Sequence, residues 1–224
     1  MQHFSLSPNG TIHADKHHRL IDVYDLEFGK AVFLIAQNQT DFSDRARFGP
    51  RTQSPLQQNP AGWLAQNIEK IAQITHAHSA TRPVLIPIPI AAVMDENCVT
   101  ACHAALSGSP LCPQEVCLEL DDATVTLMGN ALNPILEALL RHGFRIGINA
   151  SVTATAPLSE GLRLLVDTYR VDVRCLDRDR TLQDRIEAAA ATGLSIIAEN
   201  ARWRDGPFLA QLGIQYALSP GHDD

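Results

Sequence analysis

Short apolar runs alternate with helical patterns along most of this chain. Runs typical of buried strands cover 84–90, 115–120, 144–149, 171–176, 194–199 and 214–218. Between them, apolar residues recur at helical spacing over 63–74, 133–143, 158–166, 181–193 and 208–212. Strands separated by helices in this way are typical of βαβ units, so the pattern predicts an α/β fold built on a parallel sheet.

Two further apolar segments, 20–26 and 30–36, flank Glu27-Phe28-Gly29 and are expected to form an antiparallel hairpin. Seven or eight strands in 224 residues favour a closed barrel over an open, doubly wound sheet. We therefore expect a tail over 1–18 and one barrel domain over 19–224. The polar stretch 37–62 is long for a loop, which marks it as functional, partly helical or disordered.

Composition narrows the class of partner. The formal net charge is -7, and no basic tract stands out, so a nucleic-acid polymer is not expected. No apolar run approaches a membrane span, and the first residues lack the apolar core of a leader. We expect a cytoplasmic protein with no membrane partner.

The five cysteines are odd in number and are expected to be free thiols in a reducing compartment. Cys98 and Cys102 would share one helix face beside His103, an arrangement that could begin a zinc site. A second pair of ligands is missing from the pattern. The two thiols are therefore interpreted as small hydrophobic side chains.

Function in such barrels collects at the carboxyl ends of the strands. Glu119 and Glu199 stand at two of these ends, with Asp177 near a third. Two carboxylates can act as acid and base or help to hold Mg²⁺. They can also simply be satisfied by backbone or arginine partners, and the small number of convergent ligands favours that interpretation.

Four segments in order carry a family resemblance. They are VCLELDD (116–122), HGFRIGINAS (142–151), VDVRCLDRDR (171–180) and GLSIIAENARW (193–203). The series resembles the EAL domain of cyclic-di-GMP phosphodiesterases, whose segments are roughly LEITE, G-hydrophobic-IDDFG, D-hydrophobic-KIDR and AEGVE. The resemblance is good over 115–217 and weaker over 20–90. It implies a modified TIM barrel with one antiparallel strand near the N-terminus.

The departures from the family pattern fall on its metal ligands. Glu119, Asp177 and Glu199 remain as remnants of the family site, and Asn149 stands where the family has an aspartate. The other ligand positions, the supporting lysine and the last glutamate are substituted, and they fall on Ile35, Pro87, Ala150, Cys175 and Arg202. Two-metal hydrolysis needs both ions held close together. Exchanging carboxylates for Ile, Asn and Ala removes the charge that holds hard cations. We expect no catalytic residues, no Mg²⁺ cofactor and no cyclic-di-GMP hydrolysis.

Three functions stay open on these grounds. The first is a bacterial regulatory or interaction module with an unknown protein partner. The second is a receptor that binds cyclic-di-GMP without cutting it. The third is an enzyme with residual or altered chemistry, for example with Cys175 as a nucleophile activated by neighbouring arginines. The resemblance also allows a homodimer.

Overall fold

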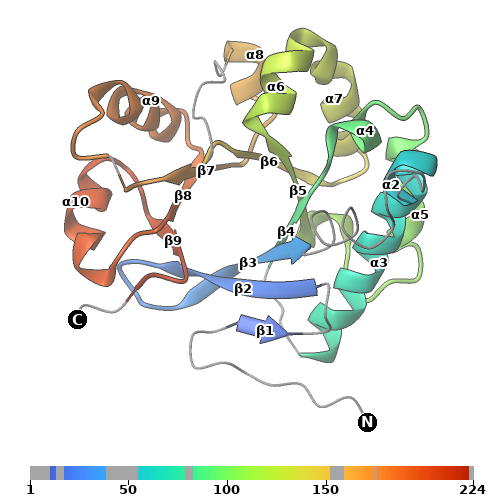
Figure 1. Cartoon of the computed structure of the whole chain (residues 1–224), viewed down its shortest axis with the longest axis horizontal. Helices are drawn as coiled ribbons and strands as arrows, with labels where there is room; N and C mark the ends of the chain where they lie inside the picture. Colours follow the sequence, from blue (N-terminus) through green and yellow to red (C-terminus); the bar gives the residue numbers. More distant parts are fainter. Residues whose placement is uncertain are drawn as a thin grey trace, which may run out of the picture.

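The computed structural model describes residues 11–13, 18–38, 55–78, 83–151, 159–174 and 176–221. Eight of the nine strands in the described residues close into a ring, with helices around the outside (Figure 1). The strands are β1 (Thr11–His13), β2 (His18–Asp25), β3 (Ala31–Asn38), β4 (Val84–Pro87), β5 (Val116–Asp121), β6 (Arg145–Asn149), β7 (Thr168–Asp172), β8 (Ser195–Glu199) and β9 (Tyr216–Leu218).

Strands β3 to β9 are parallel to one another, whereas β2 is antiparallel to both of its ring neighbours, β3 and β9. The predicted α/β barrel with one antiparallel strand near the N-terminus is confirmed. The predicted hairpin is confirmed as β2 and β3. Strand β1 was not predicted: it lies within the expected tail and pairs with Arg19–Ile21 of β2.

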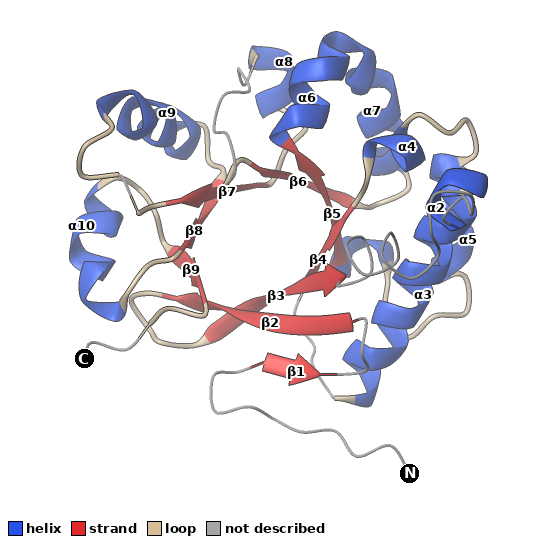
Figure 2. Ribbon diagram, viewed as in Figure 1, coloured by secondary structure: helices blue, strands red, loops and turns tan. Residues whose placement is uncertain are grey.

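Helices follow most of the parallel strands and cover the outside of the ring (Figure 2). They are α2 (Pro55–Gln58), α3 (Pro60–Ala77), α4 (Ile90–Val93), α5 (Cys98–Leu106), α6 (Asp122–Met128), α7 (Asn133–Arg141), α8 (Glu160–Arg163), α9 (Arg180–Ala191) and α10 (Gly206–Gln211). Short 3-10 helices are η1 (Pro113–Glu115), η2 (Gly129–Leu132) and η3 (Trp203–Asp205).

Helix termini agree with local sequence signals. Asn59 caps α3, because its side-chain oxygen accepts a hydrogen bond from the Gly62 amide, and Pro60 opens the helix. Asp121 caps α6 in the same way through the amide of Thr124. The polar stretch 37–62 is thus partly helical, since α2 and the start of α3 lie in it, while 39–54 falls outside the described residues.

The hydrophobic core has two parts. Outward-facing strand residues pack with helix residues in a large cluster that includes Leu64 of α3, Leu136 of α7 and Ile186 of α9. A second cluster has only strand residues as its buried members, namely Val23, Phe33, Ile35, Leu85, Cys117 and Ile197. Successive strand residues point to opposite faces, so this second cluster fills the inside of the ring. The barrel is a packed core and not a channel.

The seam of the ring lies along one edge of β2. Strand β9 pairs with Val23–Asp25, and β1 pairs with Arg19–Ile21 on the same edge. Both partners run antiparallel to β2, so β1 and β9 run in the same direction along consecutive parts of this edge. No helix of the described part is long and apolar enough to cross a membrane.

Candidate functional site

A buried arginine lies at the carboxyl end of the barrel. Arg170 is the middle residue of β7, and only 5% of it is exposed. Strand alternation sends Tyr169 and Val171 into the outer core, and both are buried there. Thr168 and Arg170 therefore face the inside. The amide of Ala150, which follows β6, donates a 2.7 Å hydrogen bond to the Arg170 carbonyl and fixes its backbone.

The guanidinium of Arg170 joins two carboxylates from other strands. Its Nε donates to Oε1 of Glu119 at 2.8 Å, and Nη2 donates to Oε2 of the same residue, which makes a bidentate pair. Its Nη1 donates to Oε1 of Glu199. Glu119 comes from β5 and is 3% exposed, while Glu199 ends β8. We call Arg170, Glu119 and Glu199 the ion triad.

Burial and charge act in opposite directions on this arginine. Removal from water alone would lower the pKa of Arg170. The negative charges and hydrogen bonds of Glu119 and Glu199 outweigh that effect and hold the pKa of Arg170 above its ordinary value. The guanidinium is therefore a permanent internal cation, and it provides a charged partner for the carboxylates inside the barrel.

A third carboxylate, that of Asp172, lies beside the ion triad, because Asp172 is the strand partner of Glu199. Asp172 ends β7 and accepts hydrogen bonds from the backbone amide and Nε of Arg174. Partial burial would raise the pKa of Asp172, but these hydrogen bonds and one from Asn200 lower it overall. Asn200 has a φ of 60°, a left-handed conformation that asparagine tolerates. The Asp172 carboxylate is thus hydrogen-bonded to Arg174, in the segment that directly follows β7.

Gly147 makes room for the triad inside the ring. It lies opposite Glu119 on β5 and opposite Thr168 on β7. A Cβ atom at this position would lie 2.4 Å from Oγ1 of Thr168 and 3.2 Å from Sγ of Cys117. Only a residue without a side chain fits between these strands.

The residues expected at the family ligand positions lie around this end of the barrel. Ile35 is fully buried in β3 and pairs with Leu85. Pro87 ends β4 opposite Glu119. Asn149 ends β6, where its Oδ1 accepts hydrogen bonds from the amide and hydroxyl of Ser151, and Ala150 is buried.

Other expected residues do not join the site. Asp177 is exposed in the turn after β7 and pairs with Arg178, with 3.4 Å between Oδ2 and Nε. Arg202 is exposed, and its amide donates to Oδ2 of Asp205 at the start of η3. Cys175 lies outside the described residues.

The strand expected over 171–176 is wrong in its bounds, because β7 spans Thr168–Asp172. Bounds that begin at Val171 leave Arg170 outside the strand, so the central residue of the site was not predicted. A signal was present: in Thr-Tyr-Arg-Val-Asp, polar and apolar side chains alternate, as expected of a strand with one face toward a polar barrel end. The apparent helix over 158–166 concealed it.

The ion triad does not fit a metal centre. Both oxygens of Glu119 and one oxygen of Glu199 already accept hydrogen bonds from Arg170. Within the described part of the chain, His, Cys, Asp and Glu side chains nowhere gather in groups of three or more that could hold a metal ion. Carboxylate oxygens that Mg²⁺ or Mn²⁺ would need as ligands are thus already bound to the guanidinium of Arg170.

Solved structures share this barrel. The PaMucR phosphodiesterase in complex with cyclic-di-GMP has a TM-score of 0.69 and 19% sequence identity, over 90% of this chain and 87% of its own. The EAL domain of Mycobacterium smegmatis DcpA has a TM-score of 0.67 and 18% identity, over 90% of this chain and 88% of its own.

The BlrP1 protein of Klebsiella pneumoniae, solved with calcium and cyclic-di-GMP, has a TM-score of 0.72 and 16% identity. The match covers 95% of this chain but 58% of the BlrP1 chain. No protein-family model matches the sequence, and no curated protein matches it. At these identities the likeness shows the fold, which is that of the EAL barrel.

Proposed function

We propose that this barrel of the EAL fold is a catalytically inactive module that serves cyclic-di-GMP-related signalling in the bacterial cytoplasm by binding a partner protein. The observation that carries the proposal is the ion triad. The guanidinium of Arg170 forms hydrogen-bonded ion pairs with Glu119 and Glu199, the two glutamates that the sequence resemblance identifies as remnants of a metal site.

The first support is electrostatic. A hard divalent cation at this position would have to displace a guanidinium that makes a bidentate pair with Glu119. Arg170 would then keep its charge close to the metal, or it would leave a site where it is almost completely buried. Both outcomes oppose metal binding, because like charges repel and an unpaired buried charge is costly.

The second support is the lack of replacement ligands. The resemblance assigns metal ligands to Ile35, Pro87 and Ala150, none of which has a side-chain oxygen. The amide oxygen of Asn149 already accepts two hydrogen bonds from Ser151. Two-metal hydrolysis needs several carboxylates that hold both ions. We infer that the barrel has lost this chemistry and that its rigid scaffold has been kept for recognition.

The position of the family lysine also changes. The segment resemblance alone places it at Cys175, with Asp177 and Arg178 keeping the flanking pattern. With β7 at Thr168–Asp172, the run Arg170-Val171-Asp172 fits the family's lysine–hydrophobic–aspartate run at the end of the strand. We infer that Arg170 replaces that lysine. An arginine at this position has the fork geometry to join two carboxylates at once, which a lysine lacks.

A second candidate is a receptor that binds cyclic-di-GMP without hydrolysis. Its support is that the PaMucR and BlrP1 structures of the same fold are complexes with this nucleotide. Isothermal titration of the whole chain with cyclic-di-GMP tests it, and heat that saturates at one nucleotide site would favour it. Absence of heat at high protein concentration would exclude the receptor function and favour the proposed partner-binding module.

The test of inactivity is a hydrolysis assay. The purified chain is incubated with cyclic-di-GMP and excess Mg²⁺ or Mn²⁺, with the PaMucR phosphodiesterase as positive control. We expect no linear dinucleotide from the chain. Turnover that depends on the metal and disappears in Glu119→Gln would overturn the proposal. Turnover that survives Glu119→Gln and disappears in Cys175→Ser would instead indicate altered chemistry.

A further inference from the structure

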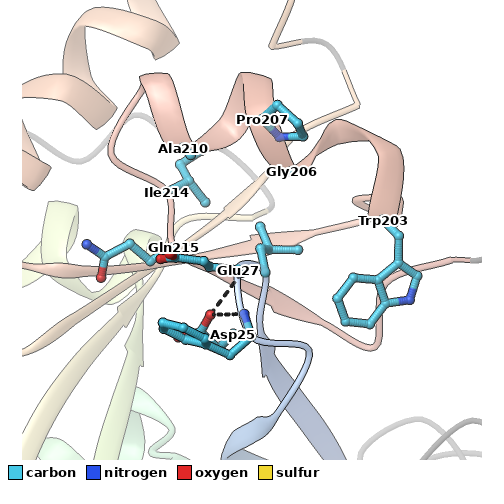
Figure 3. A pocket seen from close by; sticks show the side chains of 10 residues that line it. Asp25, Glu27, Trp203, Gly206, Pro207, Ala210, Ile214 and Gln215 are labelled. Atoms are coloured by element: carbon cyan, nitrogen blue, oxygen red, sulfur yellow. Dashed lines mark hydrogen bonds between the residues drawn. The ribbon is translucent and has the colours of Figure 1, made fainter.

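A cavity of about 460 Å³ opens at the other end of the barrel from the ion triad. It lies between the turn that joins β2 to β3 and the segment from η3 to the start of β9 (Figure 3). Strand β9 begins at Tyr216 and β3 at Ala31, so this is the amino-terminal end of the parallel strands. Glu119 and Glu199 lie at the opposite, carboxyl end.

The walls of the cavity are mostly apolar. Leu26, Trp203, Pro207, Ala210 and Ile214 line it. The ring of Trp203 is held by an edge contact with Tyr24, with 5.7 Å between ring centroids. A volume of this size is typical of sites that take a ligand or a protruding side chain.

One wall is the tip of the hairpin, where Phe28 is 66% exposed. A large aromatic side chain with this exposure at the mouth of an apolar cavity extends the apolar surface beyond the cavity itself. Trp and Phe in such positions are enriched where proteins bind one another. The surface therefore fits a protein segment better than a small enclosed ligand.

The charged residues that line the cavity are Asp25 and Glu27, and both are acidic. Oδ1 of Asp25 accepts hydrogen bonds from the amides of Glu27 and Phe28, each at 2.9 Å, as Figure 3 shows for Glu27. The turn thus holds the Asp25 carboxylate in place at the rim. Acidic groups beside Trp203 and Phe28 complement a cation, which gains from the carboxylates and from the aromatic faces.

We propose that this cavity docks a segment of a partner protein in which an apolar side chain is flanked by Lys or Arg. The apolar side chain enters between Trp203 and the exposed Ala210, and its basic neighbours lie along Asp25 and Glu27. The inference rests on the proposed function, since it gives the interaction module a docking site. It does not depend on the ion triad.

The test uses the full chain with Trp63→Phe, so that fluorescence reports on Trp203 alone. Three sets of short synthetic peptides carry one Leu or Phe flanked by Lys and Arg, by Asp and Glu, or by Ser and Gly. We expect a saturable change in Trp203 emission with the basic set and weaker binding of the other two. Ala210→Phe, which fills the cavity from the exposed side of α10, should abolish the change.

A charge variant separates the proposed contact from nonspecific attraction. Glu27→Lys should weaken the binding of the basic peptides about fivefold or more, in keeping with the loss of surface ion pairs. Glu187→Lys, on the exposed side of α9, makes the same change in net charge and should leave binding unchanged. Saturation by no set, equal binding of the acidic set, or equal effects of the two charge variants would overturn the docking site. Each result is independent of the hydrolysis assay.

Discussion

Arg170 Nε donates a 2.8 Å hydrogen bond to Oε1 of Glu119 from a strand two places away in the ring, across 51 positions of sequence. The bond crosses the inside of the barrel beside Gly147, the one residue between these strands that has no side chain to obstruct it. The charges and the space at this end of the barrel are thus arranged together.

The first prediction concerns the stability that this pair provides. Arg170→Met leaves Glu119 buried without its charged partner. We expect the free energy of unfolding to fall by about 3–5 kcal/mol in urea denaturation. Arg174→Met is the control, because the Arg174 side chain is 70% exposed and pairs with Asp172 at the surface; its loss should stay within about 1 kcal/mol. If the free energy of unfolding falls by the same small amount in both variants, the ion triad does not stabilise the fold. Adding Glu119→Gln to Arg170→Met should recover part of the loss.

The second prediction concerns metal binding. Arg170→Ser removes the internal cation and leaves two carboxylates facing one another. We expect Mn²⁺ in excess to stabilise this variant by about 1–3 kcal/mol against unfolding, relative to EDTA, because ligands that bind the folded state stabilise it. The unchanged chain should show no such difference. Combining Arg170→Ser with Glu199→Gln should remove the effect. An equal Mn²⁺ effect in the unchanged chain would contradict the proposal that Arg170 excludes metal.

The third prediction concerns packing inside the ring. Gly147→Ala places a methyl group against Oγ1 of Thr168 and Sγ of Cys117. We expect a loss of about 1–3 kcal/mol in the free energy of unfolding. Gly161→Ala is a matched control in α8, where the added Cβ makes an ordinary 3.6 Å contact with Asn133, and it should be neutral or stabilising.

A second variant identifies the cause of that loss. Thr168→Ala removes the oxygen that the new methyl group would meet, so it should lessen the cost of Gly147→Ala. The two changes should therefore couple in a double-mutant cycle. Additive losses would show that the glycine is needed for backbone reasons instead.

The fourth prediction concerns thiol reactivity. Burial raises the pKa of Cys117 to about 12, so iodoacetamide should not label this thiol in the folded chain near pH 8. The raised pKa also has a consequence for stability. The neutral thiol contributes fully below its ordinary value of 9.0, and the contribution is lost as pH rises toward about 12. Peptide-resolved mass spectrometry gives the labelling of each cysteine, and rapid labelling of folded Cys117 would contradict its burial.

Cys112 is the exposed counterpart. Its thiol donates a 3.2 Å hydrogen bond to the Glu115 carboxylate, which raises the pKa of Cys112. Glu115→Gln should therefore speed its labelling near pH 8, whereas Glu69→Gln, far along the chain in α3, should not. Equal rates in both variants would show that Glu115 does not control the thiol.

Much of the fold followed from the sequence because the local signals agree with one another. The hairpin around Glu27–Gly29 and the βαβ order from β5 to β8 combine clear apolar periodicity with turn and cap residues. Strand β1 was missed because three residues in a polar stretch carry no pattern, and only pairing with β2 defines them.

The site was harder to predict than the fold. Glu119 and Glu199 were identified as strand-end carboxylates, and backbone or arginine partners were among the interpretations. Which arginine it was depended on the register of β7. That register is set by Thr168 facing Gly147 and Ser195 across the sheet, a match between small side chains on distant strands. Local periodicity favoured Val171 as the strand start, and tertiary pairing overrode it.

The seam along β2 has a consequence for folding during synthesis. Val23 pairs with Leu218, so nearly the whole barrel is made before its ring can close. Until Tyr216–Leu218 leave the ribosome, β8 and the Val23–Asp25 part of β2 each present an unpaired edge to other chains. Contacts this distant in sequence form slowly. We expect the nascent chain to depend on chaperones over this interval, and variants that weaken β9 to reduce the yield of folded protein more than its final stability.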